Sequence, residues 1–170
     1  MWTQVKVTAP EQQIFQRITV TENSDYVDLT GVTLQKGDVC KVEVVAKNAY
    51  TSNIDLRIYI NGDENDAHYY HQYLVASGTS TSAGNSNNSS FLTLSAGERG
   101  VAELTLALDP DGYFKWLTSG TEKTSTDVNL VLTAGSKDGT VDEVTSIRIR
   151  STAAGGIAAG TVITIMKMVQ

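Results

Sequence analysis

The sequence predicts an all-β protein, an antiparallel β-sandwich or jelly roll of about ten strands. Three observations predict it. Apolar and polar residues alternate along most segments, which is the pattern of strands with one buried face. These segments follow one another at intervals of roughly 8 to 15 residues, and no convincing amphipathic helix interrupts them. The connections are rich in Gly, Ser, Asn and Asp, and the chain has 14 Gly but only 2 Pro.

The alternating runs can be placed in order along the chain. In the N-terminal half they predict strands over residues 2–7, 14–20, 26–29, 39–47, 56–60 and 68–75. In the C-terminal half they predict strands over residues 91–94, 101–108, 113–117, 128–133, 144–150 and 161–169. The last of these, 161–169, is expected to be an edge strand that needs covering or pairing. The lone cysteine, Cys40, shares the inward parity of Val42 and Val44, so we expect a small buried hydrophobe without a disulfide.

Residues 56–73 form the unit around which the other strands can be arranged. An alternating run ends at Ile60, and Asn61-Gly62-Asp63 follows it. Gly lacks a Cβ and Asn tolerates left-handed backbone, so this tripeptide predicts a tight turn. A Tyr-rich run comes next and fits a second strand.

The segment 77–90 is almost entirely Ser, Thr, Gly and Asn. It offers nothing to bury and is long for a connection, so we expect a mobile or functional loop. Its hydroxyl and amide groups suit polar recognition. The candidate contacts to a receptor or partner are the following: Ser80, Asn85, Asn87, Asn88, Tyr69 and Tyr70. The wider set of aromatic residues is either a platform for stacking sugars or ordinary core and interface material: Tyr69, Tyr70, Tyr73, Tyr113, Phe114 and Trp116.

Composition restricts the classes of partner. The formal net charge is -6 and no basic run occurs, so nucleic acid and anionic membrane surfaces are not expected partners. No segment reaches the ~18 apolar residues of a membrane span. Apolar residues make up 41% and charged residues 19%, as in a soluble folded protein. We expect one domain over residues 26–170, preceded by an arm or first strands over 1–25 that serve for attachment.

Catalytic and metal-binding patterns are missing from the sequence. No nucleophile elbow, zinc-protease motif or phosphate loop occurs, so we expect no enzyme, no catalytic residue and no cofactor. His68 and His71 are three apart, which on a strand places them on opposite faces. Asp63 and Asp66 lie in an acidic turn that lacks the spacing of an EF-hand. No metal site is predicted within one chain, although a ring of these residues across an oligomer axis stays open.

Several of these motifs resemble those of small jelly-roll virion proteins of tailed bacteriophages. The resemblance covers roughly residues 29–168 and includes both capsid-attached and tail-attached proteins. The matching elements are the apolar strand with Asn61-Gly62-Asp63, the run from Tyr70 to Gln72, the loop 77–90, the strand 144–149 and the final strand 160–165.

The resemblance implies a virion structural protein, made in the host cytoplasm and carried on the particle. Its first implied role is a capsid decoration or cement protein on the particle exterior. The alternative is a tail-fibre or receptor-binding tip that recognises a host surface glycan. It also implies a homotrimer that contacts major capsid or tail proteins.

Overall fold

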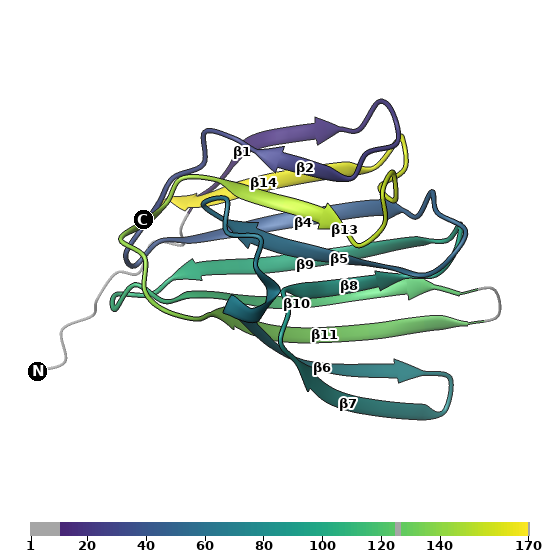
Figure 1. Cartoon of the computed structure of the whole chain (residues 1–170). Helices are drawn as coiled ribbons and strands as arrows, with labels where there is room; N and C mark the ends of the chain where they lie inside the picture. The colour runs from purple at the N-terminus through teal and green to yellow at the C-terminus, as the bar shows by residue number, and fades with distance from the viewer. Residues whose placement is uncertain (1–10, 125–126, 170) are drawn as a thin grey trace, which may run out of the picture.

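The computed structural model describes residues 11–124 and 127–169, and it is an antiparallel β-sandwich (Figure 1). The fold class predicted from alternation is therefore confirmed. The structure divides the chain into more strands than the roughly ten expected, because short bridging strands and one polar strand add to the set.

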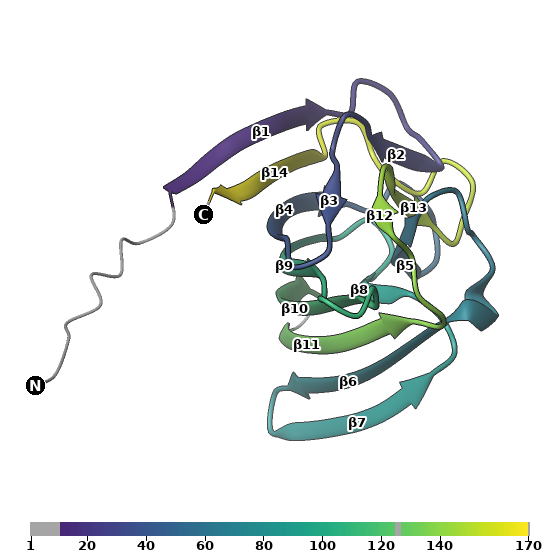
Figure 2. The same ribbon diagram turned by 90° about the vertical axis from the view of Figure 1, so that its left-hand side faces the viewer.

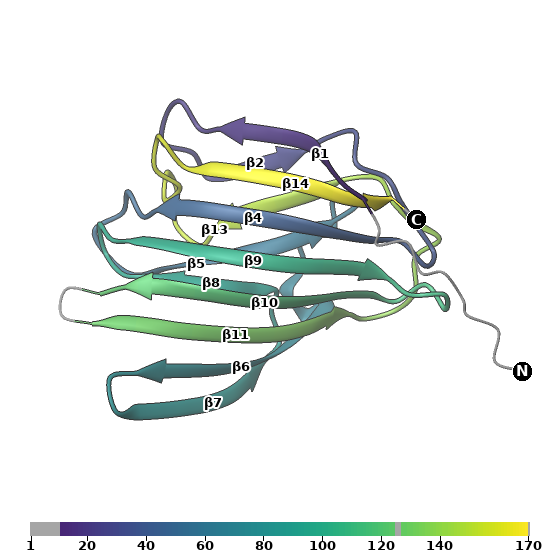
Figure 3. The ribbon, with the colours of Figure 1, turned by 180° about the vertical axis from the view of Figure 1, so that it is seen from behind.

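Two sheets face each other. The large sheet has eight strands in the order β1 (Glu11–Thr19), β14 (Val162–Val169), β4 (Val39–Lys47), β9 (Arg99–Leu108), β10 (Phe114–Lys123), β11 (Val128–Lys137), β6 (Tyr69–Ser77) and β7 (Ser80–Ser86) (Figure 3). The small sheet has four, in the order β2 (Tyr26–Leu29), β13 (Ile147–Ser151), β5 (Ile54–Ile60) and β8 (Ser90–Leu94). A short pair joins β3 (Leu34–Gln35) to β12 (Glu143–Val144), and one 3-10 turn, η1 (Asp66–His68), precedes β6.

The core lies between the sheets and follows the alternation of the sequence. In β9, Leu104, Leu106 and Leu108 are fully buried, while Val101 on the opposite face is exposed. Cys40 is buried as predicted, and burial raises the pKa of its thiol to about 12. The thiol is therefore a neutral packing group at physiological pH.

The two sheets differ in width, and this difference creates a groove. Strand β8 is the last strand of the small sheet and packs against β10 and β11. Beyond it, β6 and β7 continue the large sheet without a facing strand (Figures 1 and 2). Side chains on the inner face of β6 and β7 are therefore left half covered.

The expectation of a loop over residues 77–90 is wrong. Gly78 and Thr79 form a two-residue hairpin turn, with Gly78 at a φ of 55°, and β7 pairs with β6 in unbroken register. Backbone hydrogen bonds to β6 hold this strand. Its side chains are nearly all small and polar, so the sequence lacks the apolar–polar alternation by which the other strands were predicted.

The N- and C-terminal strands also differ from expectation. Strand β14 is not at an edge, because it pairs with both β1 and β4. Within the predicted arm 1–25, the described part forms β1, and it completes the large sheet. The strand expected over residues 2–7 lies outside the described residues.

Candidate binding groove

A groove of about 520 Å³ opens where β8 ends the small sheet. The inner faces of β6, β7 and β11 form its floor, and residues of β8 with the start of β5 form its wall. Its volume is within the range of small-molecule sites, which are typically a few hundred cubic ångströms.

The floor is set by the register of four strands. Thr118 of β10, Thr133 of β11, Tyr73 of β6 and Gly84 of β7 lie in one row across the sheet. A Cβ on Gly84 would sit 2.5 Å from Tyr73 Oη, so the tyrosine lies over the glycine. The missing side chain at Gly84 thus lets an aromatic ring lie flat on the floor of the groove.

The next row repeats this arrangement more deeply. Trp116 of β10 pairs with Gly135 of β11, and a Cβ on Gly135 would lie 2.0 Å from Trp116 Cζ2. The indole is buried and contacts the rings of Phe114 and Tyr69 at centroid distances of 6.2 and 6.3 Å. Trp116 is therefore core that supports the floor from below.

One end of the groove holds a buried carboxylate. Glu122 is 5% exposed, and its Oε1 accepts hydrogen bonds from the backbone N and the Oγ of Ser95, both at 2.6 Å. Its Oε2 accepts from Nδ2 of Asn129 at 3.2 Å, so both oxygens have donors. This carboxylate is fixed in place rather than free to move.

The other end presents an imidazole. His71 is 7% exposed, and its Nδ1 lies 3.0 Å from the carbonyl oxygen of Asn88. A carbonyl only accepts, so Nδ1 carries a proton and donates it to this hydrogen bond. The ring also lies 5.9 Å from that of Tyr73, at 35° between planes.

Three polar atoms of the floor and end have no partner among the described residues. They are Oγ1 of Thr118, Oγ1 of Thr133 and Oδ1 of Asn129. Buried polar atoms in native proteins are nearly always hydrogen-bonded, to protein, to water or to a ligand. These atoms have almost no accessible surface, so they lie beneath the floor of the groove and are not open to a ligand in it.

The groove has a negative character. Its described lining includes the carboxylates of Asp55 and Glu122 and contains neither Lys nor Arg. Asp55 Oδ1 accepts a hydrogen bond from Thr93 Oγ1 at 2.8 Å. Asp55 Oδ2 lies 3.9 Å from Nη2 of Arg57. A ligand entering here meets amides, hydroxyls, an aromatic ring and acidic groups.

The residues predicted as receptor contacts are divided between different places. Asn85 and Asn88 line the groove. Asn87 and Tyr70 lie with Lys115 in an adjoining hollow, which shares His71, Asn85 and Ser86 with the groove. Ser80 sits at the hairpin end opposite Ser77. The inclusion of Tyr69 is wrong. Its ring is fully buried and its hydroxyl bonds the backbone of Ile60 and Asp63, so no partner can reach it.

The aromatic residues considered as a platform for stacking sugars do not gather on one surface. Of the six aromatic residues considered, Tyr73 alone lines the groove. Phe114 and Trp116 are core, and Tyr113 is exposed in the turn before β10. The alternative of core material is thus correct for half of the set, namely Tyr69, Phe114 and Trp116.

The acidic turn has cationic partners of its own. Asp63 lies 3.0 Å from His68 Nδ1 and 3.1 Å from Lys137 Nζ, and Asp66 accepts a hydrogen bond from the Tyr59 hydroxyl at 2.7 Å and pairs with Arg57. His68 and His71 do not converge: the first is exposed on η1 and the second lines the groove. Among residues 11–124 and 127–169, no group of three potential ligands could hold a metal ion.

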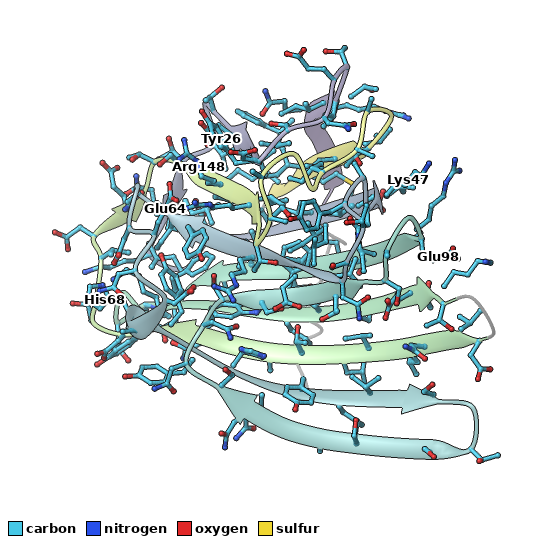
Figure 4. All side chains as sticks on the ribbon, turned by 45° about the vertical axis from the view of Figure 1, so that its right-hand side comes forward. Tyr26, Lys47, Glu64, His68, Glu98 and Arg148 are labelled. Carbon is cyan, nitrogen blue, oxygen red and sulfur yellow. The ribbon has the colours of Figure 1, made fainter. Side chains whose placement is uncertain are left out.

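A second charged cluster fixes this turn to the outer face of the small sheet (Figure 4). Arg148 makes two hydrogen bonds to Asp28, at 2.6 and 2.8 Å, and stacks on Tyr26 at 3.9 Å. Glu64 pairs with both Arg148 and Arg150. The turn is therefore held by ion pairs from both sides, which is a structural role.

Lowering the pH should weaken the contacts that Asp63 makes from the acidic turn. Burial raises the pKa of Asp63, but hydrogen bonds from His68 and Lys137 outweigh it and leave the pKa below its usual range. A carboxylate with a lowered pKa stabilises the fold above its unfolded pKa of about 4 and loses that contribution as pH falls through the folded value. We expect Asp63→Asn to be less stable than the wild type at pH 7, with the difference vanishing near pH 2.

Urea unfolding of both proteins at the two pH values measures this difference. Asp142→Asn, whose carboxylate is almost wholly exposed at its ion pair with Lys36, is the control and should change little. A difference between wild type and Asp63→Asn that stays constant across this range would contradict the assignment.

Sequence reasoning missed Glu122, Asn129 and Thr133. The strand predicted over residues 113–117 continues as β10 to Lys123. A signal was present: Phe114, Trp116, Thr118, Gly120 and Glu122 share one parity, so the carboxylate occupies an inward position. An acid on the inner side of a strand is costly without a purpose or partners.

Comparisons with known proteins leave the family open. No protein-family model matches the chain, and no curated protein matches it. Among solved structures, a crystal structure of Scytalido-glutamic peptidase with a peptide-based transition state analogue is similar at a TM-score of 0.27 and 13% identity. The match covers 87% of this chain and 66% of the peptidase. At that TM-score the likeness carries no argument about fold or activity. No helix in the described part of the chain is long and apolar enough to cross a membrane.

Proposed function

We propose that this protein is a binding module that holds a neutral oligosaccharide in the groove between β8 and the β6–β7 hairpin. The observation that carries the proposal is the combination of one aromatic ring, Tyr73, with the amide and hydroxyl side chains that line the groove around it, among them Asn85 and Asn88. A sugar presents apolar C–H faces and hydroxyl groups, which suit a ring and such polar atoms respectively.

Charge narrows the ligand class. Asp55 is paired with Arg57 at 3.9 Å, but Glu122 has no Lys or Arg among the described residues of the lining to offset it. A sulfated or uronic-acid sugar would be repelled in a groove of low dielectric, where like charges are poorly screened. We therefore propose neutral glycans, with amino sugars also compatible.

Binding fits the geometry better than catalysis. Glu122 is held by Ser95 and Asn129, and Asp55 is held by Thr93, so neither carboxylate is positioned as a free acid or nucleophile. The expectation that the protein is not an enzyme accordingly stays a prediction. Incubation with oligosaccharides and detection of shortened products would overturn it.

The resemblance to phage virion proteins supplies a biological setting. A receptor-binding tip needs a site for a host glycan, and the groove supports that role ahead of capsid decoration. The coat role retains one supporting observation, the apolar side chains of Leu74, Leu117 and Leu132 on the outer face of the large sheet. An attachment surface would cover such groups. Copy number in purified particles separates the two, since a coat is abundant and a tip is scarce.

Alanine substitutions of two tyrosines on β6, one facing the groove and one facing away, test whether the groove binds the ligand. Tyr73 faces the groove, whereas Tyr70 on the same strand is 46% exposed on the other side. A microarray of neutral and anionic oligosaccharides should first identify a neutral ligand. By calorimetry with that ligand, Tyr73→Ala should weaken binding roughly tenfold, equivalent to about 1.4 kcal/mol.

Tyr70→Ala is the matched control and should bind like the wild type. Thr133→Val removes a buried hydroxyl that has no partner at nearly constant shape, and it should not lower stability. The proposal fails if no oligosaccharide binds, or if Tyr70→Ala weakens binding and Tyr73→Ala does not.

A further inference from the structure

The two main sheets have four outer strands: β1 and β7 in the large sheet, and β2 and β8 in the small one. An outer strand presents unpaired backbone N–H and C=O groups on one side. Proteins usually guard such strands with bulges, charges, proline or shortness, because an unguarded edge pairs with other chains.

Three of the four are guarded. The pairing of β1 with β14 is broken by a register shift between Ile14 and Gln16, and Arg17 is exposed beyond it. Strand β2 is 4 residues long and β8 is 5, and the pairing of β8 with β5 also shifts register. Each of these edges is interrupted or too short to offer a long ladder.

Strand β7 lacks every one of these guards. It is 7 residues long, its sequence is STSAGNS, and it contains neither a charge nor a proline. Its register with β6 runs without interruption from Ser77↔Ser80 to His71↔Ser86. In the part of the chain that the structure describes, β6 is its only pairing strand.

We propose that two copies of this chain pair through β7, antiparallel across a two-fold axis, so that their large sheets become one continuous sheet. A two-fold contact requires a self-complementary strand. Centred on Ala83, the ladder sets Ala83 against its own copy, Ser82 against Gly84 and Thr81 against Asn85. Every facing pair is small and uncharged, so nothing clashes or repels.

A second copy fits this edge better than a foreign strand does. Strand addition by another protein takes its affinity from the backbone and its specificity from side-chain pockets or charges along the edge. The side chains of β7 from Ser80 to Ala83 are small and exposed, and they supply neither. Selectivity for an identical strand needs only matching small residues.

Pairing would also place the two grooves side by side. Gly84 and Ser86 are on the inner face of β7, and Tyr73 lies over Gly84, so each groove reaches the proposed axis. Two adjacent sites gain avidity for a repeating ligand. The dimer itself depends only on the edge and stands whether or not the groove binds sugar.

The test uses two lysine substitutions on the same outer face. Ala83 and its register partner Leu74 are both exposed, with Leu74 one strand further in and 42% exposed. Light scattering after size exclusion should give the wild type the mass of two chains. Ala83→Lys sets like charges together at the axis and should give one chain, whereas Leu74→Lys should stay dimeric.

Hydrogen exchange gives a second readout that does not depend on a variant. In the dimer, the amides of β7 that point away from β6 should exchange slowly, and in Ala83→Lys they should exchange fast. The proposal is overturned if the wild type is a monomer at high concentration. It is also overturned by the mass of a trimer, as the phage resemblance implies, or by loss of the dimer in Leu74→Lys but not in Ala83→Lys, which indicates packing through the sheet face.

Discussion

Replacing Leu106 with Asp should leave no soluble folded protein. Leu106 is fully buried in β9, where its register partners are Cys40 of β4 and Trp116 of β10. A carboxylate at this position would be cut off from water, and burying a charge without an ion-pair partner costs several kcal/mol in addition to the lost packing. A domain of this kind has only about 5–15 kcal/mol of stability in total.

Leu117→Asp is the matched control. Leu117 lies in the neighbouring strand β10 but on the outer face, and it is 59% exposed. The same chemical change there should leave expression and the melting temperature nearly unchanged. Soluble yield and thermal unfolding by circular dichroism measure both. If Leu106→Asp melts like the wild type, the two faces of β9 have been assigned the wrong way round.

The contrast between these two leucines shows why the fold could be predicted from the sequence. Parity along a strand decides which side chains meet the core, and parity is visible without coordinates. Within the strand predicted over residues 101–108, parity puts Leu104, Leu106 and Leu108 on one face, and all three are buried. The same rule failed for β7, because its residues are nearly all small and polar, so its sequence has no alternation of apolar and polar residues.

The groove was much harder to predict than the fold. It exists because one sheet has eight strands and the other four, so it depends on strand order, which no local pattern contains. Asn85 and Asn88 were selected for their chemistry, and they line the groove. Glu122 was missed even though its inward parity was readable. Tyr69 was selected wrongly, since an aromatic side chain alone does not say whether it faces core or solvent.

The second large effect on stability is expected from adding a Cβ to a glycine that lies under an aromatic ring. A Cβ at Gly135 would lie 2.0 Å from Trp116, a ring that is 2% exposed and enclosed by core. Gly135→Ala should therefore destabilise the protein by about 3 kcal/mol, the upper range for overpacking. For a domain of this length the melting temperature should fall by roughly 6–12 °C. The backbone at Gly135 does not need glycine for its φ, so sterics alone decide the result.

Gly84→Ala makes the same change with the opposite consequence. The nearest atom to its new Cβ is Tyr73 Oη at 2.5 Å, the far end of a half-buried side chain that has open groove beside it. Tyr73 can rotate away, so the melting temperature should change little while binding of the neutral oligosaccharide weakens several-fold. Thermal unfolding and calorimetry on both variants separate support of the core from shaping of the site. If Gly84→Ala loses as much stability as Gly135→Ala, Tyr73 is a fixed core residue, and the ring that the groove offers to a sugar is not available.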